Sequence, residues 1–349
     1  MSSAVPRLLS LATVVPPHAL GQAEVALRAR HLFAQSAGAD FERLMPVFAH
    51  AGIECRYSSV PIEWYEHAHG WAERNALYLQ HAVSLLHQAA DDALALAELG
   101  PEAIDAVVVV STTGVATPAL DARLMEKLPL RANVTRLPIF GLGCAGGVLG
   151  LSRAADLARA APESRVLLLV VELCALCFRK DDTAKSNIVA TALFGDGAAA
   201  AVLSCRGDGP RFGAAGEHTW PQSLDIMGWD VAEDGLRAVF SRDIPALVRN
   251  HMREVAGDFL ARHGLALRDI DHFVCHPGGA KVLSALEEAY GLGTGALVDA
   301  RGVLRDFGNM SAATVLFVLE RALRAGVSGR LLMTTLGPGF TAGFQLIDA

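Results

Sequence analysis

The chain has 349 residues, of which 52% are hydrophobic and 19% are charged, and its formal net charge is −7. A protein that coats nucleic acid would be strongly basic, and a disordered chain would be poor in apolar residues and rich in charge, so the composition excludes both classes. The length is typical of about two domains.

The mean hydropathy of +0.33 raises the question of a membrane protein. The longest apolar stretch, residues 166–178, contains Glu172. A spanning helix needs about 20 apolar residues, so the sequence predicts no membrane span. The N-terminal segment lacks a basic lead and is broken by prolines, which favours a first strand over a signal peptide. Six cysteines without a disulfide-scaffold pattern indicate a reducing, cytoplasmic location.

Short apolar runs alternate with helical patterns along the chain. Apolar runs without strict polar alternation predict strands covered on both faces, at 106–113, 166–173, 198–204, 272–276, 331–337 and 342–348. Amphipathic patterns predict helices at 76–97, 148–161, 244–263, 281–290 and 312–325. This alternation predicts an α/β layered fold.

A cluster of polar, glycine and proline residues at 205–212 predicts a boundary, with residues 1–208 on one side and 209–349 on the other. Each part has a Gly-rich turn with a reactive side chain. Cys144 lies in the first part, and His276 and Asn309 lie in the second. We therefore expect two related halves packed around one active site.

One Gly-rich segment contains two competing motifs. Gly141, Gly143 and Gly146 match G-x-G-x-x-G, a dinucleotide-binding pattern, but the acidic residue that should follow about 20 positions later is matched only loosely by Glu172. Alternatively, Cys144 is a nucleophile, because free N–H groups and the dipole at a helix N-terminus favour its thiolate. The ordinary alternative is a small buried core residue.

Two downstream residues favour the nucleophile. His276 ends an apolar strand before Pro-Gly-Gly, and Asn309 follows Gly308 and opens a helix. Alone, each has an ordinary role, as a strand-end histidine or a capping asparagine. Together, with each of the three expected at a strand-to-helix turn, they favour catalysis. The imidazole can hold a thiolate as an ion pair or donate to a carbonyl oxygen, and the amide can donate a second hydrogen bond to an enolate or oxyanion.

Four ordered motifs resemble the type III polyketide synthases, the chalcone-synthase-like branch of the thiolase fold. They are GLGCAGG with Cys144, ALFGDGAAA at 192–200, CHPGG with His276, and GNMSAATVLFVLE with Asn309. The related ketoacyl synthase III enzymes share Cys, His and Asn but usually follow the histidine with Gln-Ala-Asn. The resemblance implies a thiolase-like αβαβα fold with two related halves, and a homodimer.

The resemblance also implies roles for the three residues. Cys144 would take the acyl group of an acyl-CoA or carrier-protein starter and hold it as a thioester. His276 and Asn309 would bind the malonyl-CoA thioester carbonyl, favour loss of CO2 and stabilise the enolate that attacks acyl-Cys144. Repeated condensation and cyclisation would give a pyrone or a resorcinol. Coenzyme A thioesters are then the substrates, and we expect no other cofactor, no metal and no nucleic-acid partner.

The resemblance places further residues along the substrate cavity. Phe194 matches the gatekeeper phenylalanine, for which core packing is the alternative. The other expected lining residues are Thr112, Thr117, Cys174, Cys177, Trp229, Gly278, Lys281 and Ser311. The C-x-x-C pattern of the two cysteines would also fit metal or redox chemistry, but no second pair or spaced histidine completes a zinc site. Histidines near Glu66 (His67, His69 and His81) suggest a metal site too, but we expect them to be exposed.

Two departures from the family concern the starter. Ala238 stands at the second gatekeeper position, with Phe240 two residues on. The basic residues that contact CoA phosphates are missing in register, where only Arg56 and His50 occur, and Lys281 is the expected substitute. Small residues near the gate leave room for a long aliphatic starter, as in bacterial alkylpyrone and alkylresorcinol synthases. Two alternatives stay open: a ketoacyl synthase III-like single condensation, and a nucleotide- or acyl-binding protein.

Overall fold

The computed structural model describes residues 4–349, except for the side chains of residues 34–40. The strands are β1 (Arg7–Val14), β2 (His18–Gly21), β3 (Cys55–Ser58), β4 (Ala106–Val110), β5 (Thr135–Ile139), β6 (Arg165–Leu173), β7 (Asp196–Ser204), β8 (Arg211–Thr219), β9 (Met227–Ala232), β10 (Gly235–Phe240), β11 (His272–Cys275), β12 (Arg330–Gly337) and β13 (Thr341–Asp348). The α-helices are α1 (Gln22–Leu44), α2 (Pro46–His50), α3 (Trp71–Leu96), α4 (Leu120–Leu124), α5 (Gly146–Ala160), α6 (Lys185–Leu193), α7 (Ile244–Ala261), α8 (Ala280–Tyr290), α9 (Val298–Phe307) and α10 (Thr314–Arg324).

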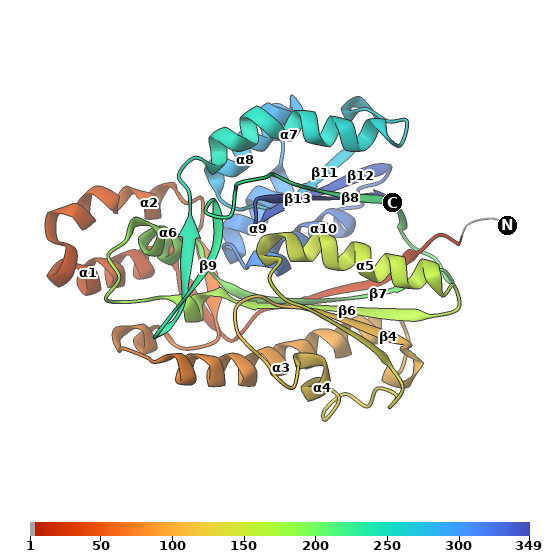
Figure 1. The fold of residues 1–349 in the computed structure, drawn as a ribbon, viewed down its shortest axis with the longest axis horizontal. Coiled ribbons are helices and arrows are strands. Elements are labelled where there is room, and N and C mark those ends of the chain that lie inside the picture. Colours follow the sequence, from red (N-terminus) through yellow and green to blue (C-terminus); the bar gives the residue numbers. More distant parts are fainter. Residues whose placement is uncertain (1–3) are drawn as a thin grey trace.

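Five layers are stacked from the bottom to the top of the view in Figure 1. They are α3 with α4, a sheet containing β4, β6 and β7, then α5 with α10, a second sheet containing β8, β12 and β13, and finally α7 with α8. This arrangement confirms the predicted layered α/β fold, because each apolar sheet face is covered by helices. No helix of the described residues is long and apolar enough to cross a membrane.

The two sheets join at a single point. The strand order is β11-β12-β13-β8-β1-β7-β6-β4-β5, but β1 and β8 share only the pair Arg7 and Arg211. Strands β6 and β7 are buried along almost their whole length, which explains their continuous apolar sequences. The predicted division at residue 208 falls in the loop between β7 and β8, and the assignment of two domains stays a prediction.

The strands and helices predicted after residue 70 are all present, within a few residues of the expected bounds. The elements that the sequence did not indicate are α1, α2, α4, α6, α9 and several surface strands. Strands β5 and β8, for example, have many exposed positions and therefore few apolar residues to mark them. The β9–β10 hairpin lies beside α6 in Figure 1 and outside both main sheets.

Candidate active site

Cys144 lies on a turn that both halves of the chain hold in place. Residues Gly143–Ala145 form a 3-10 turn between β5 and α5. The backbone N–H of Gly143 donates to Thr112 Oγ1 at 3.1 Å, and Thr335 Oγ1 donates to the carbonyl oxygen of Cys144 at 2.7 Å. Gly143 has φ +47°, and a Cβ there would lie 2.6 Å from the ring of Pro338. This position therefore requires glycine.

The glycines around Cys144 serve close packing and not a dinucleotide. A Cβ on Gly146 would lie 2.6 Å from Val110, and one on Gly147 would lie 2.2 Å from the carbonyl oxygen of Ala312. These contacts bring α5 against the first sheet and against the residues before α10. Glu172, the acid required by the dinucleotide interpretation, is fully buried and cannot reach a ribose. The dinucleotide interpretation is therefore wrong.

His276 follows β11 and is buried, with only 4% of its surface exposed. Its backbone N–H donates to the carbonyl oxygen of Thr334 at 2.8 Å, which continues the pairing with β12. Both ring nitrogens are buried and lack a hydrogen-bond partner among the described residues. Burial lowers the pKa of His276 to about 3, so the imidazole is neutral at physiological pH. Of the two options for this residue, donation to a carbonyl oxygen is therefore favoured over an ion pair.

Asn309 follows a helix, which corrects the expected strand-to-helix turn. Helix α9 ends at Phe307, and its polar, strongly amphipathic sequence does not resemble a buried strand. Asn309 Oδ1 accepts a hydrogen bond from the Ser311 backbone N–H at 2.8 Å, and Nδ2 donates to the Gly278 carbonyl oxygen at 3.4 Å. A Cβ on Gly278 would lie 3.9 Å from His276 Nε2. The amide and the imidazole therefore meet at one glycine turn.

Glu172 lies close enough to Cys144 to affect the pKa of its thiol. The sequence did not indicate this position for Glu172. Its carboxylate accepts hydrogen bonds from the Thr112 N–H and from Thr113 Oγ1, both at 2.9 Å, and from Ser311 Oγ at 3.4 Å. Burial nevertheless raises the pKa of Glu172 to about 7. The sequence signal for a buried carboxyl was an acidic residue inside the apolar 166–178 stretch, because a glutamate is rarely buried without hydrogen-bond or charged partners.

Cys144 rests as a thiol. Burial raises its pKa to about 12, and the nearby Glu172 adds to this effect, whereas a hydrogen bond with Ser311 opposes it. Burial of the thiol therefore opposes the thiolate that the helix N-terminus is expected to favour. A base must take the thiol proton when the acyl donor arrives.

The burial of Glu172 predicts a pH-dependent stability. An unfolded glutamate ionises near 4.5, but folded Glu172 keeps its proton until about pH 7. Between these values the native state binds more protons, so its stability falls as pH rises, by an amount on the order of 3 kcal/mol. Glu172→Gln should flatten the decline of Tm across this window. Burial also raises the pKa of Asp196 to about 6, so Asp196 contributes a similar decline of Tm in the wild type and in Glu172→Gln. An identical Tm profile for the wild type and the variant would contradict the prediction.

A cavity of about 390 Å³ contains Cys144, His276 and Asn309. Gly278 and Lys281 line it as well, as expected. Basic side chains from separate segments also line this cavity: Arg43, His50, Lys185, Arg242 and Lys281. Only His50 and Lys281 could be named from the sequence. The other three come from α1, α6 and the loop between β10 and α7, which approach one another only in the folded chain.

Phe194 lines a second, narrower apolar cavity of about 60 Å³ and is absent from the lining of the larger one. Cys174, Cys177, Phe194 and Ala238 line its inner end. Trp229 lies behind them, with its ring 5.8 Å from that of Phe194, and Phe240 packs at 5.6 Å on the same ring. Phe240 therefore supplies the second aromatic residue that Ala238 does not.

Four expected lining residues line neither cavity, namely Thr112, Thr117, Trp229 and Ser311. Thr112 and Ser311 are buried behind the turn, where they contact Gly143 and Glu172 and do not line either cavity. Thr117 is exposed on the surface loop after β4 and lines neither of the two cavities.

Arg56 has a structural role. It is 3% exposed and donates to the carbonyl oxygens of Thr191 and Phe194, at 2.6 and 3.0 Å, and to Gln22 Oε1. A guanidinium held by these acceptors is not available to a phosphate, which agrees with the expectation that the usual CoA-phosphate contacts are missing in this segment.

The described residues contain no group of three or more His, Cys, Asp or Glu side chains that could hold a metal ion. Cys174 and Cys177 are both free thiols. His67 is exposed as expected, but His69 is half-buried, because it stacks on Trp64 at 3.8 Å and contacts Glu73 at 2.7 Å.

Comparison with known proteins shows matches across both halves. Models of the N-terminal and C-terminal domains of chalcone and stilbene synthases match residues 55–207 and 212–346. A 1,3,6,8-tetrahydroxynaphthalene synthase of Streptomyces peucetius subsp. caesius is 40% identical over 96% of this chain and 91% of its own length. The crystal structure of the corresponding synthase of Streptomyces coelicolor A3(2) covers 98% of this chain and 99% of that one, with 29% identity and a TM-score of 0.93.

Proposed function

This chain belongs to the chalcone and stilbene synthase family, the type III polyketide synthases, and on that premise we propose that it extends a long-chain fatty acyl starter with malonyl-CoA and cyclises the product to a pyrone or resorcinol. Members of this family are acyltransferases that condense acyl-CoA units with loss of CO2. Membership excludes the alternative of a non-catalytic binding protein and disfavours a single ketoacyl synthase III condensation.

In this proposal Cys144 is the nucleophile. Its sulfur attacks the starter thioester carbonyl, and His276 in the same cavity passes the Cys144 proton to the departing CoA thiolate, so CoA leaves as the free thiol and the imidazole ends the step neutral. Malonyl-CoA then replaces the free CoA. His276 Nε2 and Asn309 Nδ2 donate to its thioester oxygen, the carboxylate leaves as CO2, and its bonding electrons form the enolate. The enolate carbon attacks acyl-Cys144, which forms the new carbon–carbon bond and releases the sulfur.

The apolar cavity beside Phe194 is the observation that carries the choice of starter. Beyond the two cysteines it continues along α1, where Val25, Ala29 and Leu32 line it. A narrow apolar channel suits a linear alkyl chain, because each buried methylene contributes about 0.8 kcal/mol. The polar side chains Arg28 and Glu66, which form an ion pair with each other, lie on the same lining.

A panel of starters tests this choice. We expect palmitoyl-CoA to give higher kcat/KM than acetyl-CoA, with mass spectrometry of the products showing more than one added two-carbon unit. Ala238→Phe should fill the inner end of the channel and reduce palmitoyl-CoA use by about tenfold or more, without the same loss for acetyl-CoA. Val231→Phe, at an 81% exposed position of the same hairpin, is the matched control. Equal use of both starters by the wild type would contradict the proposal.

A second candidate is an enzyme that uses malonyl-CoA as starter and extender. The 40% identical relative is named for tetrahydroxynaphthalene synthesis, and a Pseudomonas fluorescens relative, 29% identical over 85% of this chain and 86% of its own length, is named phloroglucinol synthase. Malonyl-CoA supplied alone distinguishes the two. An aromatic product formed at the same rate with and without fatty acyl-CoA would favour this candidate.

The basic side chains around the larger cavity are proposed to bind the phosphates of coenzyme A. Arg242 and Lys281 are exposed and come from separate segments of the chain. Replacing both with Gln should raise KM for malonyl-CoA about tenfold, because two cation–phosphate contacts are lost. The rate with malonyl-N-acetylcysteamine, which has no phosphate, should be unchanged. A parallel loss with that analogue would show instead that the two side chains support the cavity.

The predicted homodimer, the carrier-protein donor and the cytoplasmic location stay predictions. Coenzyme A thioesters are the proposed substrates, and the proposed reaction uses no other cofactor.

A further inference from the structure

The β9–β10 hairpin contributes to the walls of both cavities. Within the described residues, its two strands pair only with each other and with neither main sheet. Met227 and Phe240, paired at the base of the hairpin, line the larger cavity, and Ala238 lines the narrower one. The position of the hairpin therefore affects the shape of both cavities.

The base and middle of the hairpin pack on Phe194. Trp229 and Phe240 contact its ring, and Ala238, Cys174 and Ala190 belong to the same apolar cluster. The backbone around Phe194 is held independently, because the Asn309 N–H donates to the Leu193 carbonyl oxygen at 2.8 Å. A shift of the hairpin would therefore separate its side chains from a fixed Phe194.

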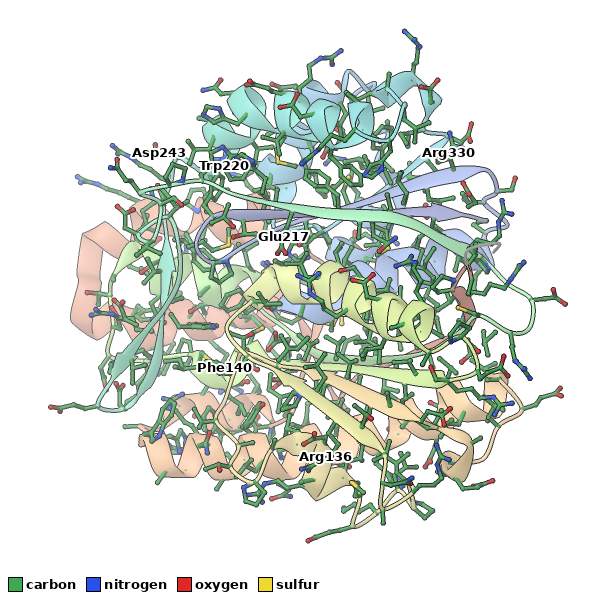
Figure 2. All side chains as sticks on the ribbon, turned by 45° about the vertical axis from the view of Figure 1, so that its right-hand side comes forward. Arg136, Phe140, Glu217, Trp220, Asp243 and Arg330 are labelled. Carbon is green, nitrogen blue, oxygen red and sulfur yellow. The ribbon has the colours of Figure 1, made fainter. Side chains whose placement is uncertain are left out.

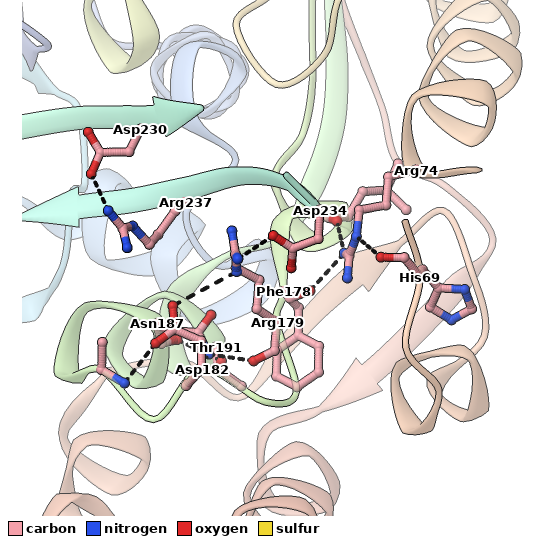
Figure 3. A network of polar contacts seen from close by, with 12 residues as sticks. His69, Arg74, Phe178, Arg179, Asp182, Asn187, Thr191, Asp230, Asp234 and Arg237 are labelled. Carbon is pink, nitrogen blue, oxygen red and sulfur yellow. Dashed lines mark hydrogen bonds and ion pairs between the residues drawn. The ribbon is translucent and has the colours of Figure 1, made fainter. Parts of the chain in front are cut away.

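The tip of the hairpin is attached to the body of the protein by an ion pair. Asp234 contacts the guanidinium of Arg179, and Figure 3 shows Asp182 on the other side of the same arginine. Asp182 Oδ2 lies 3.9 Å from Arg179 Nε, which is too far for a hydrogen bond. Arg179 has two buried nitrogens without a hydrogen-bond partner among the described residues. Asp234 is therefore its closer and stronger partner.

The attachment point is itself rigid and lies next to the two cysteines. Asn187 Nδ2 donates to the carbonyl oxygens of Arg179 and Asp182, both at 2.7 Å. Arg74, buried beside the hairpin tip, donates to the carbonyl oxygen of Phe178 at 2.7 Å. Burial lowers the pKa of Arg74, and the negative charge of Asp234 partly opposes this. Figure 3 shows Arg74 and Arg179 on either side of Asp234. The ion pair therefore connects the hairpin tip to the segment that follows the Cys174–Cys177 turn.

The hairpin carries a second ion pair, which joins its two strands and does not attach the tip to Arg179. Asp230 and Arg237 face each other across the two strands at 2.8 Å, and both are half-exposed. In Figure 3 this pair lies within the hairpin and away from Arg179. Its hydrogen bond joins one strand to the other, and the charges of Asp182 and Asp234 act on Arg237 only more weakly than that of Asp230, so Asp230→Asn serves as a matched control.

We propose that Asp234 is a specificity-determining positioning residue, which fixes the hairpin tip to Arg179 and so keeps Ala238 and Phe240 against Phe194. The inference rests on the proposed function, because it concerns the room available to the starter and the growing chain. Loss of the ion pair would let the hairpin move outward, which would widen the narrower cavity at Phe194 and displace Met227 and Phe240 in the wall of the larger one.

The test compares Asp234→Asn with Asp230→Asn. In Asp234→Asn, we expect the ratio of kcat/KM for palmitoyl-CoA to that for hexanoyl-CoA to change about three- to tenfold, with longer products in the mass spectrum. Asp230→Asn should keep the wild-type ratio, and Asp234→Glu should restore it. High salt should move the wild-type ratio toward that of Asp234→Asn, because the Asp234 side chain is 42% exposed and its charge can be screened. Hydrogen exchange at 227–240 should increase only in Asp234→Asn.

Two results would overturn the inference: an unchanged ratio in Asp234→Asn, or an equal change in Asp230→Asn. Asp234 is 42% exposed in its side chain at a turn, so its replacement by Asn should not prevent folding, and Tm would verify this. A wild-type enzyme that uses neither fatty acyl-CoA would instead contradict the proposed function. The two failures are therefore distinguishable.

Discussion

Cys144→Ala is expected to reduce polyketide formation by about 10³-fold or more. The cysteine is the one side chain of the larger cavity that can hold an acyl group as a thioester. Without its sulfur, the starter has no covalent attachment and the enolate has no electrophile in place. Intact-protein mass spectrometry after incubation with palmitoyl-CoA should show the added acyl mass on the wild type and none on the variant.

The matched control is Cys205→Ala. Cys205 is a half-buried thiol outside both cavities, where its sulfur contacts the carbonyl oxygen of Ala158. The Cys205→Ala variant should acquire the acyl mass on Cys144 and make product at the wild-type rate. An acyl adduct retained by Cys144→Ala would show that another residue is loaded, and the proposed role of Cys144 would then be wrong.

His276→Ala and Asn309→Ala should each slow decarboxylation of malonyl-CoA by about 10²- to 10³-fold, while acylation of Cys144 is reduced less. The reason is that each variant removes one of two hydrogen-bond donors that meet at Gly278, where the enolate oxygen is proposed to lie. Release of labelled CO2 and acylation of the protein should be measured separately. Equal losses in both steps would contradict the assigned roles.

The neutral state of His276 adds an expected pH dependence of decarboxylation. Because burial lowers its pKa to about 3, the imidazole should stay neutral from pH 5 upward, so the decarboxylation rate should not follow a histidine titration near pH 6.5. His276→Gln keeps an N–H donor without a basic nitrogen. It should retain more decarboxylation than His276→Ala but load Cys144 slowly. His87→Ala, on the surface of α3, is the control for a neutral substitution.

Much of the fold could be predicted because the signals are local. The central strands β6 and β7 and helix α5 have continuous or periodic apolar sequences, which report burial directly. Helix α9 and the β9–β10 hairpin could not be predicted in the same way. Their positions depend on contacts with distant segments, and their exposed faces leave a mixed sequence.

The candidate site divides in the same manner. Cys144, His276 and Asn309 could be identified because each follows or precedes glycines in a motif of a few residues. The basic side chains of the larger cavity could not be assembled, because they come from α1, α2, α6, α8 and the loop between β10 and α7.

The sequence by itself determined the layered α/β architecture, the absence of a predicted membrane span and the identity of the three candidate catalytic residues. Only the tertiary structure decided their chemical state. Cys144 rests as a thiol, His276 is neutral and Glu172 keeps its proton to about pH 7, because each is removed from water by residues far away in the chain. The charge of a side chain depends on its surroundings in space, and no neighbouring sequence specifies those surroundings.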